Sequence, residues 1–175
     1  LDYAHARGAV LCASMGDANQ FLFYPAAHKE VIAVGAIDDD ALVADFSNTG
    51  NHINVVAPGE EIMSLQSSIT ITAYTIIDDY ALMNGTSAAA PMVSGIAAYL
   101  RAVSPGLSPE RALEIIEQSA VDLEYPYGPG TQYLPGWDKY SGYGLVDLEA
   151  ALQMAPDVRA RITSPARNVA CNGTV

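Results

Sequence analysis

The sequence is poor in basic residues and in cysteine, and it has no long hydrophobic run. It has 8 Lys and Arg against 20 Asp and Glu in 175 residues, which gives a formal net charge of −12. This acidity argues against nucleic acid and against anionic membrane surfaces as partners. Half of the residues are hydrophobic, but no run is long enough to cross a membrane, so we expect a soluble domain with a substantial core.

Two cysteines do not make a disulfide framework. Cys12 lies in an apolar segment, where we expect a small core residue, and Cys171 lies in the C-terminal tail. The chain begins with Leu1 instead of Met, which suggests a fragment or a processed piece. The lack of a visible targeting signal therefore excludes little.

The acidic residues are partly clustered, at positions 38–40, 60–61 and 78–79. Two interpretations stay open for each cluster: solvated loop charge, or a site that attracts calcium. The sequence alone assigns no residue as a metal ligand.

Three apolar segments, at residues 9–14, 31–37 and 53–57, predict buried strands, because parallel strands are apolar along their whole length. Residues 1–8 predict the end of a helix with Gly8 as its stop, and later helices are expected after Ser108-Pro109 and at residues 146–154. This alternation predicts an α/β sheet. In such sheets, chemistry collects beyond the carboxyl ends of the strands.

The segment at residues 84–98, NGTSAAAPMVSGIAA, joins a turn to a helix with almost no polar residues. Asn84-Gly85 is a turn signal, and the apolar run up to Leu100 predicts a helix that is buried on all sides. Pro91 is expected in the first turn, which places the helix start at residues 86–88. Ser87 then lies at the positive end of the helix, either as an N-cap only or as a group next to a developing anion.

Residues 85–91, GTSAAAP, closely resemble the nucleophile motif G-T-S-x-A-x-P of subtilisin-like serine proteases (subtilases, peptidase family S8). Residues 31–36 (VIAVGA), 46–50 (FSNTG) and 55–59 (VVAPG) resemble that family's VIAVGA, FSxxG and VxAPG segments in the right order. Residues 142–147 (GYGLVD) resemble the G-x-G-x-[VI]-[DN] entry to its last catalytic-domain helix.

The resemblance covers roughly residues 1–155 and implies a three-layer subtilisin-like α/β fold with a mainly parallel sheet, present here as its C-terminal part. Residues 156–175 then form a linker or the start of a further module. The implied activity is that of a secreted or extracytoplasmic serine endopeptidase, which hydrolyses protein or peptide substrates through an acyl-enzyme on Ser87. No cofactor is required for this chemistry, and structural calcium is left open.

The resemblance also implies a catalytic Asp and His, in D-[ST]-G and H-G-T-H motifs, and neither motif occurs here. The three histidines, His5, His28 and His52, are expected at the surface and do not replace them. The upstream part of the same domain, before Leu1, would supply both residues, so the chain alone is expected to be inactive. The alternative is an incomplete fragment, or a module that binds a peptide or a partner without catalysis.

Aligning residues 9–17 with the corresponding strand of the family puts Asp17, with Thr86 nearby, where most members have the Asn that donates a hydrogen bond to the oxyanion. An ionised carboxylate cannot donate, and losing the donor costs ~10²–10³ in kcat, a range that comes from a subtilisin and thus from the family itself. Two interpretations remain open. A site of low dielectric raises the pKa of Asp17 so that a protonated carboxyl donates, or the donor is lost and the protein is slow or inactive.

The resemblance implies a further set of substrate-binding residues around the nucleophile. A ring at position 23, where a Gly is common, predicts a small pocket and small or medium P1 side chains; alternatively, the ring turns into the core. Residues 59–84 predict a β-hairpin beside the nucleophile loop. Two interpretations of it stay open: it shapes the leaving-group side of the cleft, or it is structural only. The substrate-binding residues are Ser14, Met15, Gly16, Phe23, Tyr24, Asn84 and Gly85.

Overall fold

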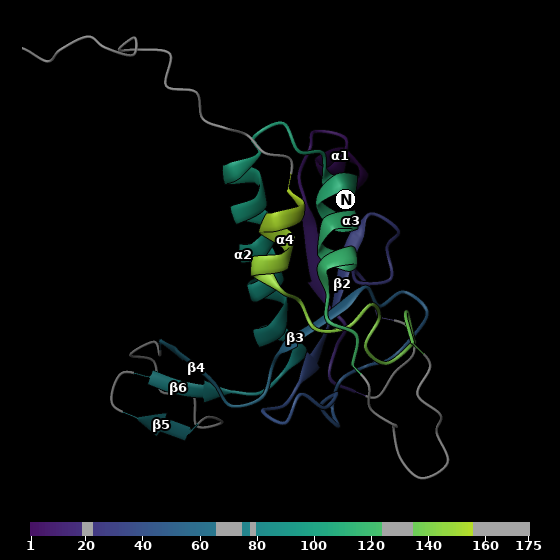
Figure 1. The fold of residues 1–175 in the computed structure, drawn as a ribbon. Helices are drawn as coiled ribbons and strands as arrows, with labels where there is room; N and C mark the ends of the chain where they lie inside the picture. The colour runs from purple at the N-terminus through teal and green to yellow at the C-terminus, as the bar shows by residue number, and fades with distance from the viewer. Residues whose placement is uncertain (19–22, 66–74, 78–79, 124–134, 156–175) are drawn as a thin grey trace, which may run out of the picture.

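The computed structural model describes residues 1–18, 23–65, 75–77, 80–123 and 135–155 (Figure 1). The expectations for residues 69–72, 78–79, 125–134 and 156–175 lie outside these ranges. The described residues form two three-stranded sheets, one parallel and one antiparallel. The elements follow in the order α1 (Asp2–His5), β1 (Leu11–Ser14), β2 (Val31–Ile37), β3 (Val55–Pro58), β4 (Ile62–Leu65), β5 (Thr75–Ile77), β6 (Tyr80–Met83), α2 (Thr86–Val103), α3 (Pro109–Ser119) and α4 (Leu148–Met154).

The parallel sheet has the strand order β1-β2-β3. The central strand, β2, is buried at every position, as expected for a parallel strand covered on both faces. The three strands predicted from the apolar segments are confirmed, with bounds within two residues of those expected. The predicted start of α3 is also confirmed, since the Ser108 side chain accepts a hydrogen bond from the Arg111 N–H, with Pro109 as the first helical residue.

Alternate side chains of β2 divide the core into two clusters. Ile32, Val34 and Ala36 pack in a larger cluster with α2, α3 and α4, which lie together on one face of the sheet (Figure 1). Ala33 and Ile37 point to the other face, into a smaller cluster that residues from loops complete. The α/β architecture expected from the sequence is therefore confirmed.

Helix α2 differs from the prediction in two ways. Only one stripe of it is buried, and the opposite side, which includes Ser94, Gly95 and Ala98, is exposed. The prediction of burial on all sides was wrong because side chains this small give no contrast between a covered face and an open one. Pro91 lies in the second turn, not in the first, so its missing N–H leaves the carbonyl of Ser87 without its usual intrahelical donor.

The antiparallel sheet has the order β4-β6-β5 and protrudes from the body of the molecule, next to the start of α2 (Figure 1). The hairpin predicted before Asn84 is confirmed in β5 and β6. Strand β4 adds a second pairing, in which Met63 faces Leu82 and Leu65 faces Tyr80.

Residues 141–146 return to the parallel sheet beside β3. The Val56 N–H donates to the Gly144 carbonyl, and the Val146 N–H donates back to the Val56 carbonyl. Gly144 has a φ of +111°, and a Cβ there would overlap the carbonyl oxygen of Val121. A glycine is thus required for this close approach of two backbones.

We predict that Gly144→Ala destabilises the fold, since a left-handed φ costs on the order of 1–3 kcal/mol for a residue with a Cβ, before the clash with Val121 is counted. Gly95→Ala is the matched control, because a Cβ at Gly95 meets nothing within 4 Å and the position is helical. It should raise the free energy of unfolding by about 1 kcal/mol. Chemical denaturation followed by circular dichroism measures both, and equal effects of the two substitutions would contradict the prediction.

Candidate active site

Ser87 lies at the carboxyl edge of the parallel sheet, in the first turn of α2. Its side chain is exposed, whereas the residues before it, Gly85 and Thr86, are buried. The first four N–H groups of a helix have no intrahelical acceptor, so the N–H of Ser87 is directed toward the positive end of the helix dipole. This geometry presents a hydroxyl and a hydrogen-bond donor at one accessible point.

Thr86 joins the start of α2 to the end of β1. Its hydroxyl accepts a hydrogen bond from the Gly16 N–H (3.0 Å) and donates to Asp17 Oδ1 (2.7 Å). Its backbone N–H donates to the same carboxylate oxygen (2.8 Å). Asp17 is therefore an acceptor for the first turn of the helix, and the site residues Gly16, Asp17, Thr86 and Ser87 form one connected group.

Asn48 holds the loop after β1 in place, a role that the sequence analysis did not predict. Its fully buried amide donates to the Met15 carbonyl (2.7 Å) and accepts from the Ala18 N–H (3.0 Å), and its backbone N–H donates to the Gly16 carbonyl. Three hydrogen bonds thus fix the backbone on both sides of Asp17. Asn48 belongs to the FSNTG segment, but its residue type alone does not distinguish an Asn that hydrogen-bonds a distant loop from one that forms a local turn.

The residues predicted to bind substrate lie in or near this loop, but they differ in how exposed they are. The Phe23 ring remains 40% exposed and lies against Gly16, where a Cβ would come within 3.1 Å of the ring. The alternative interpretation, in which the ring turns into the core, is therefore wrong. The Met15 side chain is fully buried in the smaller core cluster, Ser14 is half-buried in β1, and Tyr24 is exposed.

The Asn84-Gly85 turn connects the antiparallel sheet to α2. Asn84 Oδ1 accepts from the Glu61 N–H (2.7 Å), and the Gly85 N–H donates to the Gly59 carbonyl (2.8 Å). At Gly85 the φ is +147°, and a Cβ would approach Asp17 Oδ2 to 3.0 Å. The turn therefore needs glycine both for its backbone conformation and for the carboxylate beside it.

All three histidines lie at the opposite, amino edge of the sheet. His28 and His52 precede β2 and β3, and His5 ends α1 before β1. Helix α2, about 27 Å long, has Ser87 in its first turn and Arg101 near its end. The Arg101 guanidinium donates to the carbonyl of Gly8, which precedes β1, so the far end of the helix lies at the amino edge. The length of the helix therefore separates Ser87 from this edge. None of the histidines lies near Ser87. All three are half-buried, whereas the sequence led us to expect them at the surface.

Among the residues that the structure describes, four groups away from Ser87 have displaced pKa values. Burial raises the pKa of the Cys12 thiol, which packs against the core as expected, and burial lowers the pKa of His52. Burial also raises the pKa of Glu117, against the hydrogen bond that Asn54 Nδ2 donates to it. The pKa of Glu110 is lowered by hydrogen bonds from its own backbone and from Ser108, and to a smaller extent by the charge of His5.

Two of the predicted acidic clusters meet in space. Asp39, Glu60 and Glu61 line one pocket of about 220 Å³. This grouping is compatible with calcium, but carboxylates on exposed loops also gather without an ion. None of the helices in the described part of the chain combines the length and apolar character that a membrane span requires.

The comparisons with known proteins agree with this geometry. The subtilase family (peptidase S8) model matches residues 1–144. The chain is 34% identical to subtilisin DY of Bacillus licheniformis, over 87% of this chain and 50% of that protein. It is 33% identical to the halolysin-like extracellular serine protease Nep of Natrialba magadii, over 86% of this chain and 24% of that protein.

Solved structures show the same fold. The crystal structure of fervidolysin from Fervidobacterium pennivorans matches with a TM-score of 0.72 and 34% identity, over 89% of this chain and 24% of that one. A lanthipeptide protease matches with a TM-score of 0.72 and 26% identity, over 89% of this chain and 53% of that one. The chain belongs to the subtilase family, and it spans about half the length, or less, of these relatives.

We predict that Thr86→Val lowers the free energy of unfolding by about 1–3 kcal/mol, because it leaves the buried Gly16 N–H without an acceptor. Ser87→Ala is the control at the adjacent position, where the side chain is exposed, and it should change stability by no more than about 0.5 kcal/mol. Urea denaturation of the two variants measures the difference. A Thr86→Val protein as stable as Ser87→Ala would show that the link to β1 contributes little.

Proposed function

We propose that this chain is the nucleophile-bearing, C-terminal part of a serine endopeptidase catalytic domain, with Ser87 as the nucleophile. The observation that supports this most is the exposed hydroxyl of Ser87 in the first turn of α2, at the carboxyl edge of a subtilisin-like sheet. Family membership adds to it, since the relative Nep is a serine protease by name. The substrates would be proteins or peptides.

The reaction would begin with attack of Ser87 Oγ on a peptide carbonyl carbon. The new bond forms as a base removes the hydroxyl proton, and the carbonyl oxygen becomes an oxyanion. The N–H of Ser87 and the positive end of α2 are placed to stabilise that charge. The carbonyl then re-forms as the peptide C–N bond breaks, and the leaving amine takes the proton from the protonated base. Water, with its proton removed by the same base, would then hydrolyse the acyl-enzyme and release Ser87.

The base and its orienting carboxylate would come from the upstream part of the same domain. All three histidines of this chain lie at the amino edge of the sheet, so the chain alone would have no base for Ser87. It would therefore be inactive until that part is present. Secretion, suggested by extracellular relatives such as Nep, and structural calcium near Asp39, Glu60 and Glu61 belong to the same proposal.

Asp17 would limit the rate of this enzyme. Its Oδ1 accepts two hydrogen bonds from Thr86, an arrangement suited to a carboxylate, and the side chain is exposed rather than enclosed by apolar groups. A carboxylate beside the oxyanion has no proton to donate. We therefore favour the second interpretation of Asp17, in which the oxyanion lacks its side-chain donor.

We predict that a fluorophosphonate probe labels Ser87 in the complete catalytic domain, and that Ser87→Ala abolishes labelling. The matched control is Ser94→Ala, two turns along the same helix, where the residue is exposed and its hydroxyl donates to the Ala90 carbonyl. Labelling and peptide mapping by mass spectrometry measure both. Persistent labelling of Ser87→Ala would contradict the assignment, and no labelling from acid to neutral pH would favour a peptide-binding module without catalysis.

We predict that Asp17→Asn raises kcat at neutral and alkaline pH by up to ~10²–10³, the range known for this donor in a subtilisin of the same family. In this variant the amide oxygen can keep both hydrogen bonds from Thr86, while the amide nitrogen offers a donor where the Oδ2 atom of Asp17 lies now. A pH–rate profile of the complete domain measures the effect. A variant no faster than the natural protein above pH 7 would contradict the donor argument.

A further inference from the structure

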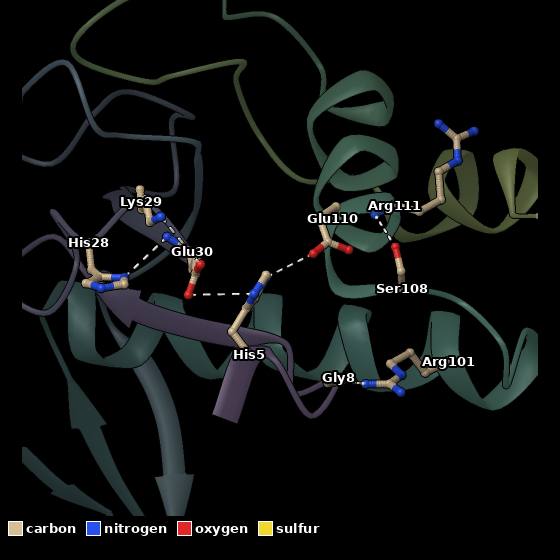
Figure 2. Close-up of polar contacts among 9 residues, drawn as sticks. All are labelled: His5, Gly8, His28, Lys29, Glu30, Arg101, Ser108, Glu110 and Arg111. Carbon is tan, nitrogen blue, oxygen red and sulfur yellow. Dashed lines mark hydrogen bonds and ion pairs between the residues drawn. The ribbon is translucent and has the colours of Figure 1, made fainter. Parts of the chain in front are cut away.

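Two histidines and three carboxylates gather at the amino edge of the parallel sheet, at the end of the molecule opposite Ser87. Figure 2 shows four of these five side chains, those of His5, His28, Glu30 and Glu110. They come from three segments that are distant in the sequence: α1, the turn before β2, and the first turn of α3. The proposed peptidase chemistry uses none of them. The members of this cluster are Asp2, His5, His28, Glu30 and Glu110.

Three members of the cluster are close enough to share one ion. Asp2, His28 and Glu30 each offer a ligand atom, and these atoms lie within 4.8 Å of one another. Asp2 Oδ1 and His28 Nε2 are 3.2 Å apart. Two ligand atoms on a tetrahedral zinc ion are separated by about 3.3 Å, since the metal–ligand bonds are about 2.0–2.1 Å. The distance between Asp2 and His28 matches this separation, and Glu30 would have to move closer to complete the set of ligands.

Glu30 lies between the two histidines, and its carboxylate has only long contacts (Figure 2). Its Oε2 atom is buried and has no hydrogen-bond partner, with His5 Nδ1 3.6 Å away. Its Oε1 atom is 3.8 Å from Lys29 Nζ, whose side chain is 81% exposed and thus offers a weak pairing. Neither contact is short enough for a hydrogen bond, so a bound cation would give this partly buried carboxylate a stronger partner.

We propose that Asp2, His28 and Glu30 form a zinc site, with water as the fourth ligand. An imidazole nitrogen beside two carboxylates suits Zn²⁺ better than Ca²⁺ or Mg²⁺, which take oxygen ligands. His5 is a positioning residue: it bridges Glu30 to Glu110, at 3.6 and 3.4 Å, and so orients the Glu30 carboxylate.

Binding requires one proton to move on His28. In the structure His28 Nδ1 accepts a long hydrogen bond from the Glu30 N–H (3.3 Å), so in the neutral ring Nε2 has the proton, 3.2 Å from Asp2 Oδ1. Coordination through Nε2 places the proton on Nδ1 instead and breaks the bond to Glu30. One weak hydrogen bond is thus exchanged for three metal–ligand bonds.

Such an ion would bind Asp2 in α1 together with His28 and Glu30 in the turn before β2, and so would hold the helix against that turn. Helix α1 has four residues, none of them buried, so few contacts hold it to the body of the molecule. An ion that binds the folded chain and not the unfolded one adds its binding free energy to the stability of the fold. The site would thus serve the structure of the amino edge, independently of whether Ser87 is catalytic.

The test is titration of the chelator-treated chain with Zn²⁺ in a calorimeter, with Co²⁺ absorption as a second probe of nitrogen ligation. A Cys171→Ser background removes the tail thiol as a competing ligand. We expect one equivalent of Zn²⁺ and a rise in Tm. His28→Gln and Glu30→Gln should each abolish binding, and His5→Gln should weaken it about 10–100-fold, the usual cost of losing a group that orients a ligand.

His52→Gln is the matched control, because His52 lies at the same edge of the sheet outside the cluster and should leave zinc affinity unchanged. Circular dichroism of each metal-free variant verifies that it is folded. A chain that binds no Zn²⁺, or one that binds it equally well after both His28→Gln and Glu30→Gln, would overturn the site and leave the cluster as a set of ion pairs. Loss of binding in His52→Gln as well would also overturn it.

Discussion

The arrangement of the candidate active site depends on the hydroxyl of Thr86. It is the one group that accepts from the Gly16 N–H and donates to Asp17, and the backbone N–H of the same residue donates to Asp17 as well. These three bonds join the end of β1 to the start of α2, and the buried Asn48 fixes the loop that follows β1. Ser87 is exposed, but the residue before it is buried and hydrogen-bonded through both its hydroxyl and its N–H, which holds the start of the helix in place.

Much of the fold could be predicted from short local signals. The strand limits follow from runs of apolar residues, and the start of α3 follows from Ser108-Pro109, because both depend on interactions within a few residues. The exposed side of α2 and the place of Pro91 could not be predicted. Ala, Gly and Ser give no periodic contrast, and whether such a helix face is covered depends on residues far away in the sequence.

The site was predicted in part. The sequence placed Asp17 and Thr86 near Ser87, but it could not show that the Asp17 carboxylate accepts from Thr86, since that depends on the distance between two elements about 70 residues apart in the chain. The role of Asn48 and the grouping of His5, His28 and Glu30 were missed for the same reason. A polar residue in a loop shows its partners only when the fold brings them together.

The return of residues 141–146 to the edge of β3 affects the order in which the chain folds. Val56 pairs across the sheet with Leu145, so the outer edge of β3 has no backbone partner there until nearly all of the described residues have left the ribosome. Contacts of such long sequence separation form slowly, and an open strand edge invites pairing with another chain in the meantime. The sheet is therefore most exposed to aggregation during synthesis, before its last segment arrives.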